Sequence, residues 1–227
     1  MLLKFLQKQP ADKILALMAA YRADTRDTKV DLGVGVYKDA SGNTPVMRAV
    51  KEAEKRLQAE QTSKAYVGLA GDPAFSGVMI DLVLGDTIAR DRISAVATPG
   101  GTGAIRQALE LIKMAAPEAT VWLSNPTWPN HPSIIKYLDM KSADYRYFNN
   151  ETRGVDFDGM LADLDGVQTG DVVLLHGCCH NPTGANLTLD QWDLVIALLQ
   201  TKGATPFIDI AYQGFGDGLA EDAAATR

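Results

Sequence analysis

Short apolar runs alternate with longer amphipathic stretches through the second half of this 227-residue chain. The runs are typical of buried strands, and apolar residues three and four positions apart in the stretches between them predict helices. We expect strands at 93–99, 120–124, 143–148 and 171–176, and a last strand from Thr205. Strands that alternate with helices predict an α/β fold, a mostly parallel sheet with helices on both faces.

The N-terminal segments follow a different pattern. Residues 1–10 predict an arm, and an apolar stripe over 11–22 predicts a helix. Glycines and a Ser-Gly pair make 31–45 a loop or a short extended segment. From Pro45 the spacing of apolar residues predicts a long helix. The length of the chain allows one large domain or two small ones.

Composition argues against some classes of function. The formal net charge of −6 and the pI near 5.1 disfavour a surface for nucleic acid or for an anionic membrane. No apolar run approaches the roughly 18 residues of a membrane span, and the first residues are too polar for a signal peptide. Cys178 and Cys179 are adjacent, which predicts free thiols in a reducing compartment. We expect a cytoplasmic protein.

Polar loops rich in Gly and Pro follow the expected strands. They lie at 99–103, 124–131, 177–184 and 209–216. In a parallel sheet, ligands bind at the carboxyl ends of the strands. We therefore expect these loops to converge on one site.

Asp209 is the one acid in the apolar run that begins at Thr205. A carboxylate near the end of a buried strand needs a cationic or hydrogen-bonding partner, because burial of an unpaired charge is very unfavourable. Asp209 either meets such a partner or caps the turn that follows. His131 is a partner for Asp209, a helix-start residue or a surface residue.

The loop Gly100–Gly103 lies between an expected strand and an expected helix. Free backbone N–H groups and the positive end of the helix dipole suit a phosphate group. A dinucleotide site is less favoured, because Arg106 and Gln107 stand where a third glycine belongs. A plain tight turn between strand and helix is the alternative.

The segment from His176 to His180 holds two histidines and two cysteines, which suggests zinc. No second pair of ligands has matching spacing, so we expect no metal and consider a packed loop the alternative. Asn181 either offers its amide to a ligand or holds the tight turn that it opens. Trp128, between two prolines, either packs in the core or stacks on a planar ring at the mouth of the site.

Five motifs occur in the order LGVGVYKD (32–39), PGGTGA (99–104), SNPTWPNH (124–131), HGCCHNPTG (176–184) and DIAYQGF (209–215). Together they resemble the class I aspartate/aromatic amino-acid aminotransferases, which are fold-type I enzymes that use pyridoxal 5′-phosphate. The resemblance covers the chain from about its tenth residue onward. It implies the large domain of that fold, in incomplete form.

The resemblance implies roles for residues around the cofactor ring. Asp209 pairs with the pyridine nitrogen in such a site, with His131 and His176 behind it in the same network. Tyr212 and Asn181 hydrogen-bond the phenolic oxygen of the ring. Asn181 also contacts the substrate.

Further residues resemble those that hold the rest of the cofactor and the substrate. Gly101 and Thr102 match the backbone cup for the phosphate. Trp128 matches the residue over the ring face, near the substrate. Gly35 matches a backbone contact to the substrate carboxylate, and Tyr66 matches the tyrosine that reaches the phosphate of a neighbouring subunit.

The resemblance also implies an organisation of domains and subunits. The expected domains are an arm (1–10), the first part of a small domain (11–44) and a truncated large cofactor-binding domain (45–227). Cis peptide bonds are expected before Pro126 and Pro182. The role of the tyrosine that crosses between subunits implies a homodimer.

The catalytic lysine of this family lies beyond the strand that holds the aspartate, and here no lysine follows Lys202. The resemblance therefore implies the N-terminal part, a little over half, of an aminotransferase for amino-acid and 2-oxo-acid substrates, inactive by itself. It leaves aspartate and aromatic substrates equally open. The alternatives are an inactive cofactor- or partner-binding fragment, another fold-type I enzyme such as a lyase, and, more distantly, an NAD-dependent oxidoreductase.

Overall fold

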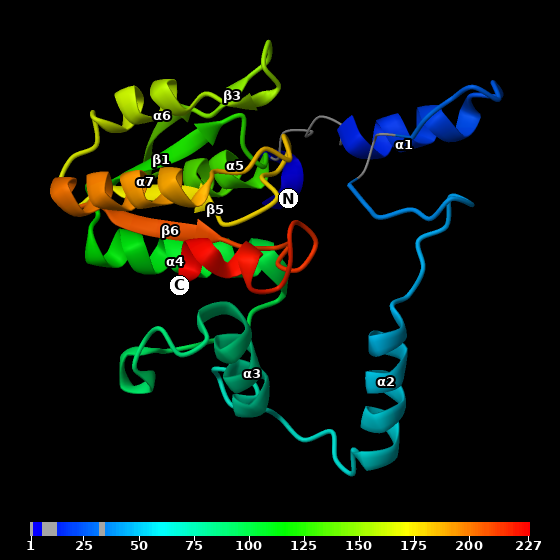
Figure 1. Ribbon diagram of the computed structural model, residues 1–227. Helices are drawn as coiled ribbons and strands as arrows, with labels where there is room; N and C mark the ends of the chain where they lie inside the picture. The colour runs from blue at the N-terminus through cyan, green and yellow to red at the C-terminus, as the bar shows by residue number, and fades with distance from the viewer. Residues whose placement is uncertain (1, 6–12, 32–34) are drawn as a thin grey trace. The chain divides into compact units, whose positions relative to one another are not determined.

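The computed structural model describes residues 2–5, 13–31 and 35–227 (Figure 1). The chain divides into two compact units, Met1–Ala65 and Tyr66–Arg227. The expected division into an arm, a small domain and a large domain stays a prediction.

Helices make up much of the described part of the first unit. They are the 3-10 helix η1 (Leu2–Phe5) and the α-helices α1 (Lys13–Ala23) and α2 (Arg48–Glu60). α1 confirms the first expected helix from its third residue onward, and the start of that helix and most of the expected arm lie outside the described residues. α2 confirms the long helix expected from Pro45, and none of its residues is buried.

The second unit begins with a capped helix, α3 (Pro73–Leu84). The carboxylate of Asp72 accepts a hydrogen bond of 2.8 Å from the backbone N–H of Ala74. Pro73 occupies the first turn of α3, where a missing N–H is not needed for a helical hydrogen bond. A 3-10 turn, η2 (Arg90–Arg92), follows α3.

The prediction of a strand at 93–99 is wrong. This segment belongs to no strand, and the backbone N–H of Ala97 donates to the carbonyl of Ala70 at 2.8 Å instead. A strand exists only where a neighbouring strand accepts and donates its backbone hydrogen bonds. None of the strands in the described part of the chain pairs with this segment, so its apolar pattern does not produce a strand.

The sheet has four strands in the spatial order β2-β1-β5-β6, and all the pairings are parallel. The strands are β1 (Thr120–Asn125), β2 (Lys141–Arg146), β5 (Val172–His176) and β6 (Thr205–Asp209). These strands confirm four of the five expected from the sequence.

The run expected at 143–148 divides at Tyr147. Its first part belongs to β2, and its last residue starts a separate antiparallel pair, β3 (Phe148–Asn149) with β4 (Gly154–Val155). The side chain of Tyr147 is buried, and its hydroxyl donates to the carbonyl of Ala185 at 2.7 Å.

Helices cover both faces of the sheet (Figure 1). α4 (Gly100–Ala115) and α5 (Asn130–Tyr137) lie on one face, and α6 (Phe157–Leu164) and α7 (Leu189–Lys202) lie on the other. The start of α7 confirms the capping box of Thr188 and Gln191 that its sequence contains. The expected fold class, a mostly parallel sheet with helices on both faces, is confirmed.

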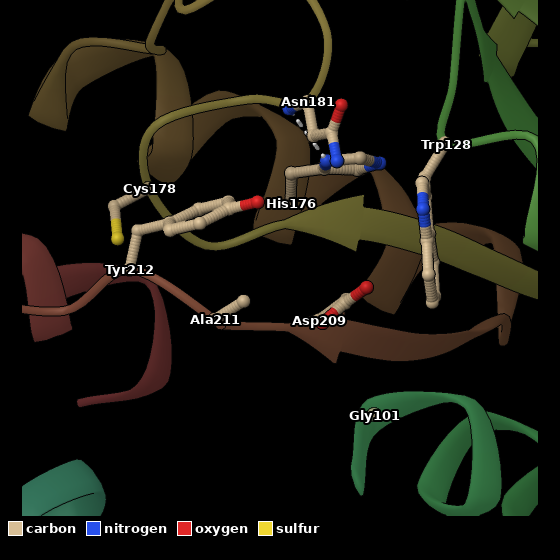
Figure 2. Close-up of a pocket in the computed structure, with 8 residues that line it drawn as sticks. All are labelled: Gly101, Trp128, His176, Cys178, Asn181, Asp209, Ala211 and Tyr212. Atoms are coloured by element: carbon tan, nitrogen blue, oxygen red, sulfur yellow. Dashed lines mark hydrogen bonds between the residues drawn. The ribbon is translucent and has the colours of Figure 1, made fainter. Parts of the chain in front are cut away.

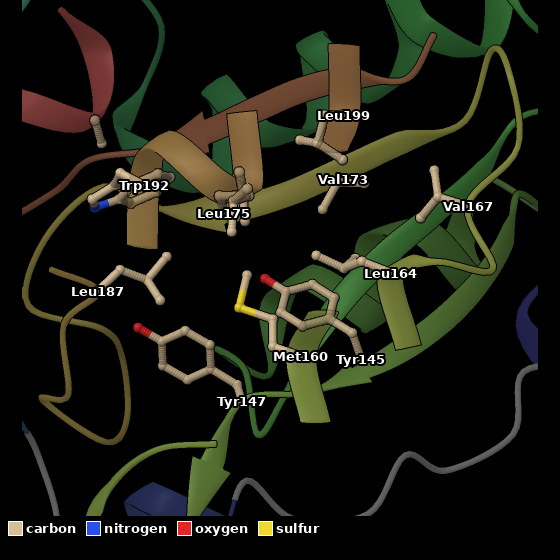
Figure 3. Close-up of a cluster of buried hydrophobic side chains, with 12 residues drawn as sticks. Tyr145, Tyr147, Met160, Leu164, Val167, Val173, Leu175, Leu187, Trp192 and Leu199 are labelled. Atoms are coloured by element: carbon tan, nitrogen blue, oxygen red, sulfur yellow. The ribbon is translucent and has the colours of Figure 1, made fainter. Parts of the chain in front are cut away.

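The central strand β5 shows why both faces of the sheet need a layer of helices. Val173 and Leu175 point to the core under α6 and α7, whereas Leu174 points to the core under α4 and α5. The first of these cores also contains buried tyrosines and Trp192 (Figure 3). A strand that is apolar on both faces has its place in the middle of a covered parallel sheet.

Asp171 ties the strands together at the amino end of the sheet. Its buried carboxylate accepts hydrogen bonds from the backbone N–H of Thr120 (2.9 Å), the indole N–H of Trp122 (3.0 Å) and the backbone N–H of Gln168 (3.0 Å). Burial raises the pKa of this carboxyl, but the donated hydrogen bonds outweigh burial and leave the pKa below its ordinary value.

The chain ends in the 3-10 helix η3 (Glu221–Thr226), which packs beside α3. The hydroxyl of Thr226 donates to the carbonyl of Val83 at 2.8 Å. Within the described ranges, no helix combines the length and the apolar character needed to cross a bilayer.

Candidate functional site

The carboxyl ends of β1, β5 and β6 and the start of α4 enclose one cavity. Its volume is about 150 Å³. The lining residues are Gly101, Trp128, His176, Cys178, Asn181, Asp209, Ala211 and Tyr212 (Figure 2). Each of the four loops expected to converge contributes to this lining. The short apolar runs thus bring polar loops from distant parts of the sequence to one edge of the sheet.

Asp209, at the end of β6, meets the partner that its burial requires. The Nε2 atom of His131, on α5, lies 3.0 Å from the Oδ2 atom of Asp209. The His131 side chain is fully buried, whereas the Asp209 side chain keeps an exposed fraction of 24%. Figure 2 shows the carboxylate extending from its strand toward the cavity. Of the alternatives left open by the sequence, the structure thus shows the pair.

Further hydrogen bonds connect this pair to β5. The Oγ1 atom of Thr127 lies 2.8 Å from Nδ1 of His131 and 3.2 Å from Nε2 of His176. The backbone N–H of Asn181 in turn donates to Nδ1 of His176 at 3.2 Å. These five residues form what we call the Asp209 hydrogen-bond chain.

The backbone donor sets the direction of every proton in the Asp209 hydrogen-bond chain. Because Nδ1 of His176 accepts from Asn181, a neutral His176 carries its proton on Nε2 and donates it to Thr127. The Thr127 hydroxyl then donates to Nδ1 of His131, so Nε2 of His131 carries the proton that points at Asp209. Neutral rings thus suffice to leave the carboxylate as an acceptor.

Burial keeps the second ring of this chain neutral. It lowers the pKa of His176 to about 4, with a further lowering from His131 and an opposing effect from Asp209. At neutral pH the imidazole is therefore uncharged, as the proton order requires.

A second layer of side chains supports these rings. The ring of His180 stacks on His176 with 4.1 Å between centroids, and the Tyr147 ring stacks on the other side of His180 at 4.0 Å. Ser124 lies 2.9 Å from Nε2 of His180, and Thr183 lies 2.9 Å from its Nδ1. Burial lowers the pKa of His180 to about 3.

Groups without a protein partner face the cavity from the other sides. In the described structure, neither the Tyr212 hydroxyl nor the Asn181 side-chain amide hydrogen-bonds another protein group, and both are labelled at the cavity in Figure 2. Trp128 presents its indole ring at the edge. The Asn125–Pro126 and Asn181–Pro182 peptide bonds are cis, as expected.

The start of α4 supplies backbone donors. No side chain caps this helix. The backbone N–H of Gly100 donates to the carbonyl of Thr98 at 2.8 Å, and the N–H groups that follow it in the first turn have no side-chain acceptor. Gly101 lines the cavity. Thr102 follows it on α4 but is not part of the lining, and its hydroxyl accepts a hydrogen bond of 3.1 Å from Asn130.

Tyr66 is an expected site residue that does not line the cavity, and its side chain is fully exposed. Gly35 belongs to the other compact unit, so its expected contact with the substrate stays a prediction. The structure also places residues at the site that the sequence did not indicate. Cys178 and Ala211 line the cavity, and Thr127 connects two histidines. The sequence feature that could have pointed to Thr127 is its place between two prolines in the loop after a strand.

A metal site is not supported by the groups that could form one. In the residues that the structure describes, the ligand atoms of Cys178, Cys179 and Asp222 lie within 4.8 Å of one another. Burial raises the pKa of the Cys178 thiol to about 12, which opposes the thiolate that a metal requires. The Asp222 carboxylate already accepts three backbone hydrogen bonds.

The donor set of the cavity fits a flat polar ring that carries an anionic group. The carboxylate of Asp209, backed by His131, suits a protonated ring nitrogen, and a phenol and an amide suit a ring oxygen. An indole suits a ring face, and helix N–H groups suit a phosphate. Pyridoxal 5′-phosphate has each of these features.

Comparisons with known proteins agree with this geometry. The family model "Aminotransferase class I and II" matches residues 27–227. The chain is 60% identical to an aromatic-amino-acid aminotransferase of Paracoccus denitrificans over 98% of this chain and 56% of the relative. It is 45% identical to an aspartate aminotransferase of Escherichia coli (strain K12) over 96% of this chain and 56% of the relative.

A solved structure shows the same fold with the cofactor. It is an aromatic-amino-acid aminotransferase from Burkholderia pseudomallei covalently bound to pyridoxal phosphate, with a TM-score of 0.94 and 41% identity over 100% of this chain and 58% of that chain. The chain thus spans a little over half the length of the relatives that it matches. With the family model matched across nearly the whole sequence, the chain belongs to the class I and II aminotransferases, a family that depends on pyridoxal phosphate.

Proposed function

We propose that the whole protein transfers an amino group between an amino acid, aromatic or aspartate, and a 2-oxo acid, with pyridoxal 5′-phosphate held in the cavity. The observation that carries this proposal is the carboxylate of Asp209, which faces the cavity while the Nε2 atom of the buried His131 lies 3.0 Å from it. The printed names of the relatives, aromatic-amino-acid and aspartate aminotransferases, support the same substrate classes.

When bound, the cofactor supplies an electron sink for the pair of electrons left after the substrate loses its Cα proton. Asp209 holds the proton on the pyridine nitrogen, because an ion pair with a carboxylate favours the charged form of that nitrogen. His131 fixes the orientation of the carboxylate through its Nε2–H donor.

The other lining residues orient and enclose the cofactor. Tyr212, Asn181 and Trp128 line the cavity. Tyr212 and Asn181 would donate to the phenolic oxygen, and Trp128 would cover the ring face and exclude water from it. The backbone N–H groups of Gly101 and Thr102, at the uncapped start of α4, hold the phosphate. His176 sets the proton order behind Asp209.

Substrate and subunit contacts extend this proposal. Trp128 and Asn181 contact the substrate beside the ring, and Gly35 offers its backbone to the substrate carboxylate. Tyr66, whose side chain is fully exposed, reaches the phosphate of a second copy in a homodimer. The two free thiols, Cys178 and Cys179, support a cytoplasmic location.

The test is an assay of the protein expressed from its complete gene. With pyridoxal 5′-phosphate present, we expect amino transfer from tyrosine, phenylalanine or aspartate to 2-oxoglutarate, dependent on the 2-oxo acid. A lyase would release ammonia or CO₂ without a 2-oxo acid, and an oxidoreductase would bind NAD tightly. Either result contradicts the proposed function.

A further inference from the structure

We propose that Asp222 is a positioning residue for Tyr212, because its buried carboxylate fixes the backbone turn that directs the phenol into the cavity. This inference rests on the proposed function, in which the Tyr212 hydroxyl bonds the cofactor. Asp222 lies on η3 and does not line the cavity.

The turn begins at Tyr212 itself. The carbonyl of Tyr212 accepts a hydrogen bond of 3.0 Å from the backbone N–H of Phe215. Gly214, at the third position of this turn, has φ of 91°, a value that favours glycine and is typical of a type II turn. The direction in which Tyr212 leaves the backbone is therefore coupled to the turn.

Asp222 binds the N–H groups of this turn and of the residues after it. Its Oδ2 atom accepts from Gly214 (2.8 Å) and Gly216 (2.9 Å), and its Oδ1 atom accepts from Asp217 (2.9 Å). The exposed fraction of Asp222 is 4%. Burial raises the pKa of its carboxyl, but these N–H donors outweigh burial and leave the pKa below the ordinary value.

The partners of Asp222 are all backbone groups. Among the described residues, no lysine, arginine or histidine forms an ion pair with it, so the loop N–H groups take the place of water around the charge. The fit is close. A Cβ atom at Gly216 would lie 2.6 Å from Oδ1 of Asp222 and 3.1 Å from the Cys179 sulfur.

The Tyr212 hydroxyl depends on this backbone anchor. The exposed fraction of the residue is 38%, and its hydroxyl has no hydrogen-bond partner in the described structure. A phenol that no other protein group holds points where its backbone directs it. Loss of the Asp222 bonds would therefore move or loosen the hydroxyl.

The test compares variants that break the same bonds from two sides, in the protein expressed from its complete gene. Asp222→Asn places an amide N–H against the N–H of Asp217, and Gly216→Ala pushes against Oδ1 while keeping the carboxylate. Tyr212→Phe removes the hydroxyl. Asp217→Asn removes an exposed charge from the same loop and is the matched control.

Two readouts separate structure from function. In the cofactor-free protein, amide hydrogen exchange over 213–218 is expected to rise about 10-fold or more in Asp222→Asn and Gly216→Ala, and not in Asp217→Asn. In the loaded protein, the pH midpoint of the cofactor's absorbance is expected to move in both variants in the same direction as in Tyr212→Phe.

The double variant decides whether Asp222 acts through Tyr212. In a Tyr212→Phe background, Asp222→Asn is expected to add less than about 0.3 pH unit to the shift, because coupled residues are not additive. The proposal is overturned if the pH-midpoint shifts of Tyr212→Phe and Asp222→Asn add fully in the double variant. It is also overturned if hydrogen exchange becomes faster in Asp222→Asn while the pH midpoint of the cofactor's absorbance stays unchanged. If Asp222→Asn does not fold, Gly216→Ala alone makes the same comparison. If the wild-type protein does not bind the cofactor, that result contradicts the proposed function and not the role of Asp222. If hydrogen exchange over 213–218 is unchanged in the variants, that result overturns the role of Asp222 whether or not the cofactor binds.

Discussion

The Nε2 atom of His131 lies 3.0 Å from the Oδ2 atom of Asp209, although the two residues are 78 positions apart in the sequence. The pair joins α5 to the end of β6 at the floor of the cavity. It also ends the Asp209 hydrogen-bond chain, which begins at a backbone N–H whose proton has a fixed direction. A rigid backbone donor at one end thus favours one tautomer of His131, the ring that contacts Asp209 at the other end.

The Asp209 hydrogen-bond chain predicts a specific effect of Thr127→Val. Valine has nearly the same shape but no hydroxyl, so Nδ1 of His131 and Nε2 of His176 lose their common partner. We expect a loss of about 1–3 kcal/mol in unfolding free energy, the usual result of leaving a buried polar group unpaired. We also expect His131 to lose its single tautomer, which ¹⁵N NMR of histidine-labelled protein measures.

Thr127→Ser is the matched control, because it keeps the hydroxyl and removes only a methyl group. We expect it to retain the Nε2–H tautomer of His131. An unchanged tautomer in Thr127→Val would show that the chain of bonds does not set the proton order.

The buried histidines predict a dependence of stability on pH. The unfolded chain protonates its histidines near pH 6.5, whereas the pKa values in the folded state are about 4 for His176 and about 3 for His180. The unfolded state therefore binds more protons between these values. The stabilisation is complete above pH 6.5 and is lost as the pH falls toward 4, by about 1.4 kcal/mol per pH unit for each ring once the unfolded ring is fully protonated.

The variant His180→Gln removes one of these titrations and keeps a polar side chain between Ser124 and Thr183. Urea unfolding at pH 6 and at pH 5 measures the slope. We expect the slope to fall in this variant by about 1 kcal/mol per pH unit. An equal slope in both proteins would mean that His180 is protonated in the folded state.

Asp171 predicts a large effect on stability far from the cavity. Asp171→Ala removes the acceptor of three N–H groups at the amino end of the sheet. We expect a loss of about 2–4 kcal/mol in the unfolding free energy, measured by urea denaturation.

The control is Asp165→Ala, in which the lost carboxylate is exposed and pairs with Lys202 at the surface. Exposed ion pairs contribute at most about 1 kcal/mol, so this variant should be close to wild type. Equal losses in Asp171→Ala and Asp165→Ala would contradict the structural role of Asp171.

Local patterns in the sequence predict much of the fold. The apolar runs predict β1, β2, β5 and β6, and the pair Thr188 and Gln191 predicts the start of α7. These features depend on residues close together in the chain. The segment 93–99 has the same kind of pattern, yet it forms no strand because pairing depends on a neighbour that the pattern does not contain.

The site, like the fold, has features that local sequence predicts and features that depend on contacts between distant segments. The loops after the strands predict where Asp209, Tyr212 and Asn181 gather, because parallel strands end at one edge. The bonds of Thr127 and the stacking of His180 depend on the register that places His176 opposite Asp209, and spacing along the chain does not specify that register. The hydrogen bonds from the backbone N–H groups of Gly214 and Gly216 to Asp222 likewise depend on the folded turn.

The most direct test of the account is equilibrium binding of pyridoxal 5′-phosphate to the protein expressed from its complete gene, compared with its Asp209→Ala variant. Asp144→Ala, which removes an exposed carboxylate from β2, is the control. The account predicts saturable binding to the wild type and to the control, and binding at least about 10-fold weaker in Asp209→Ala, since a hydrogen bond to a charged group contributes about 1.5–3 kcal/mol. Equal affinity in all three proteins, or no saturable binding to the wild type, would contradict it.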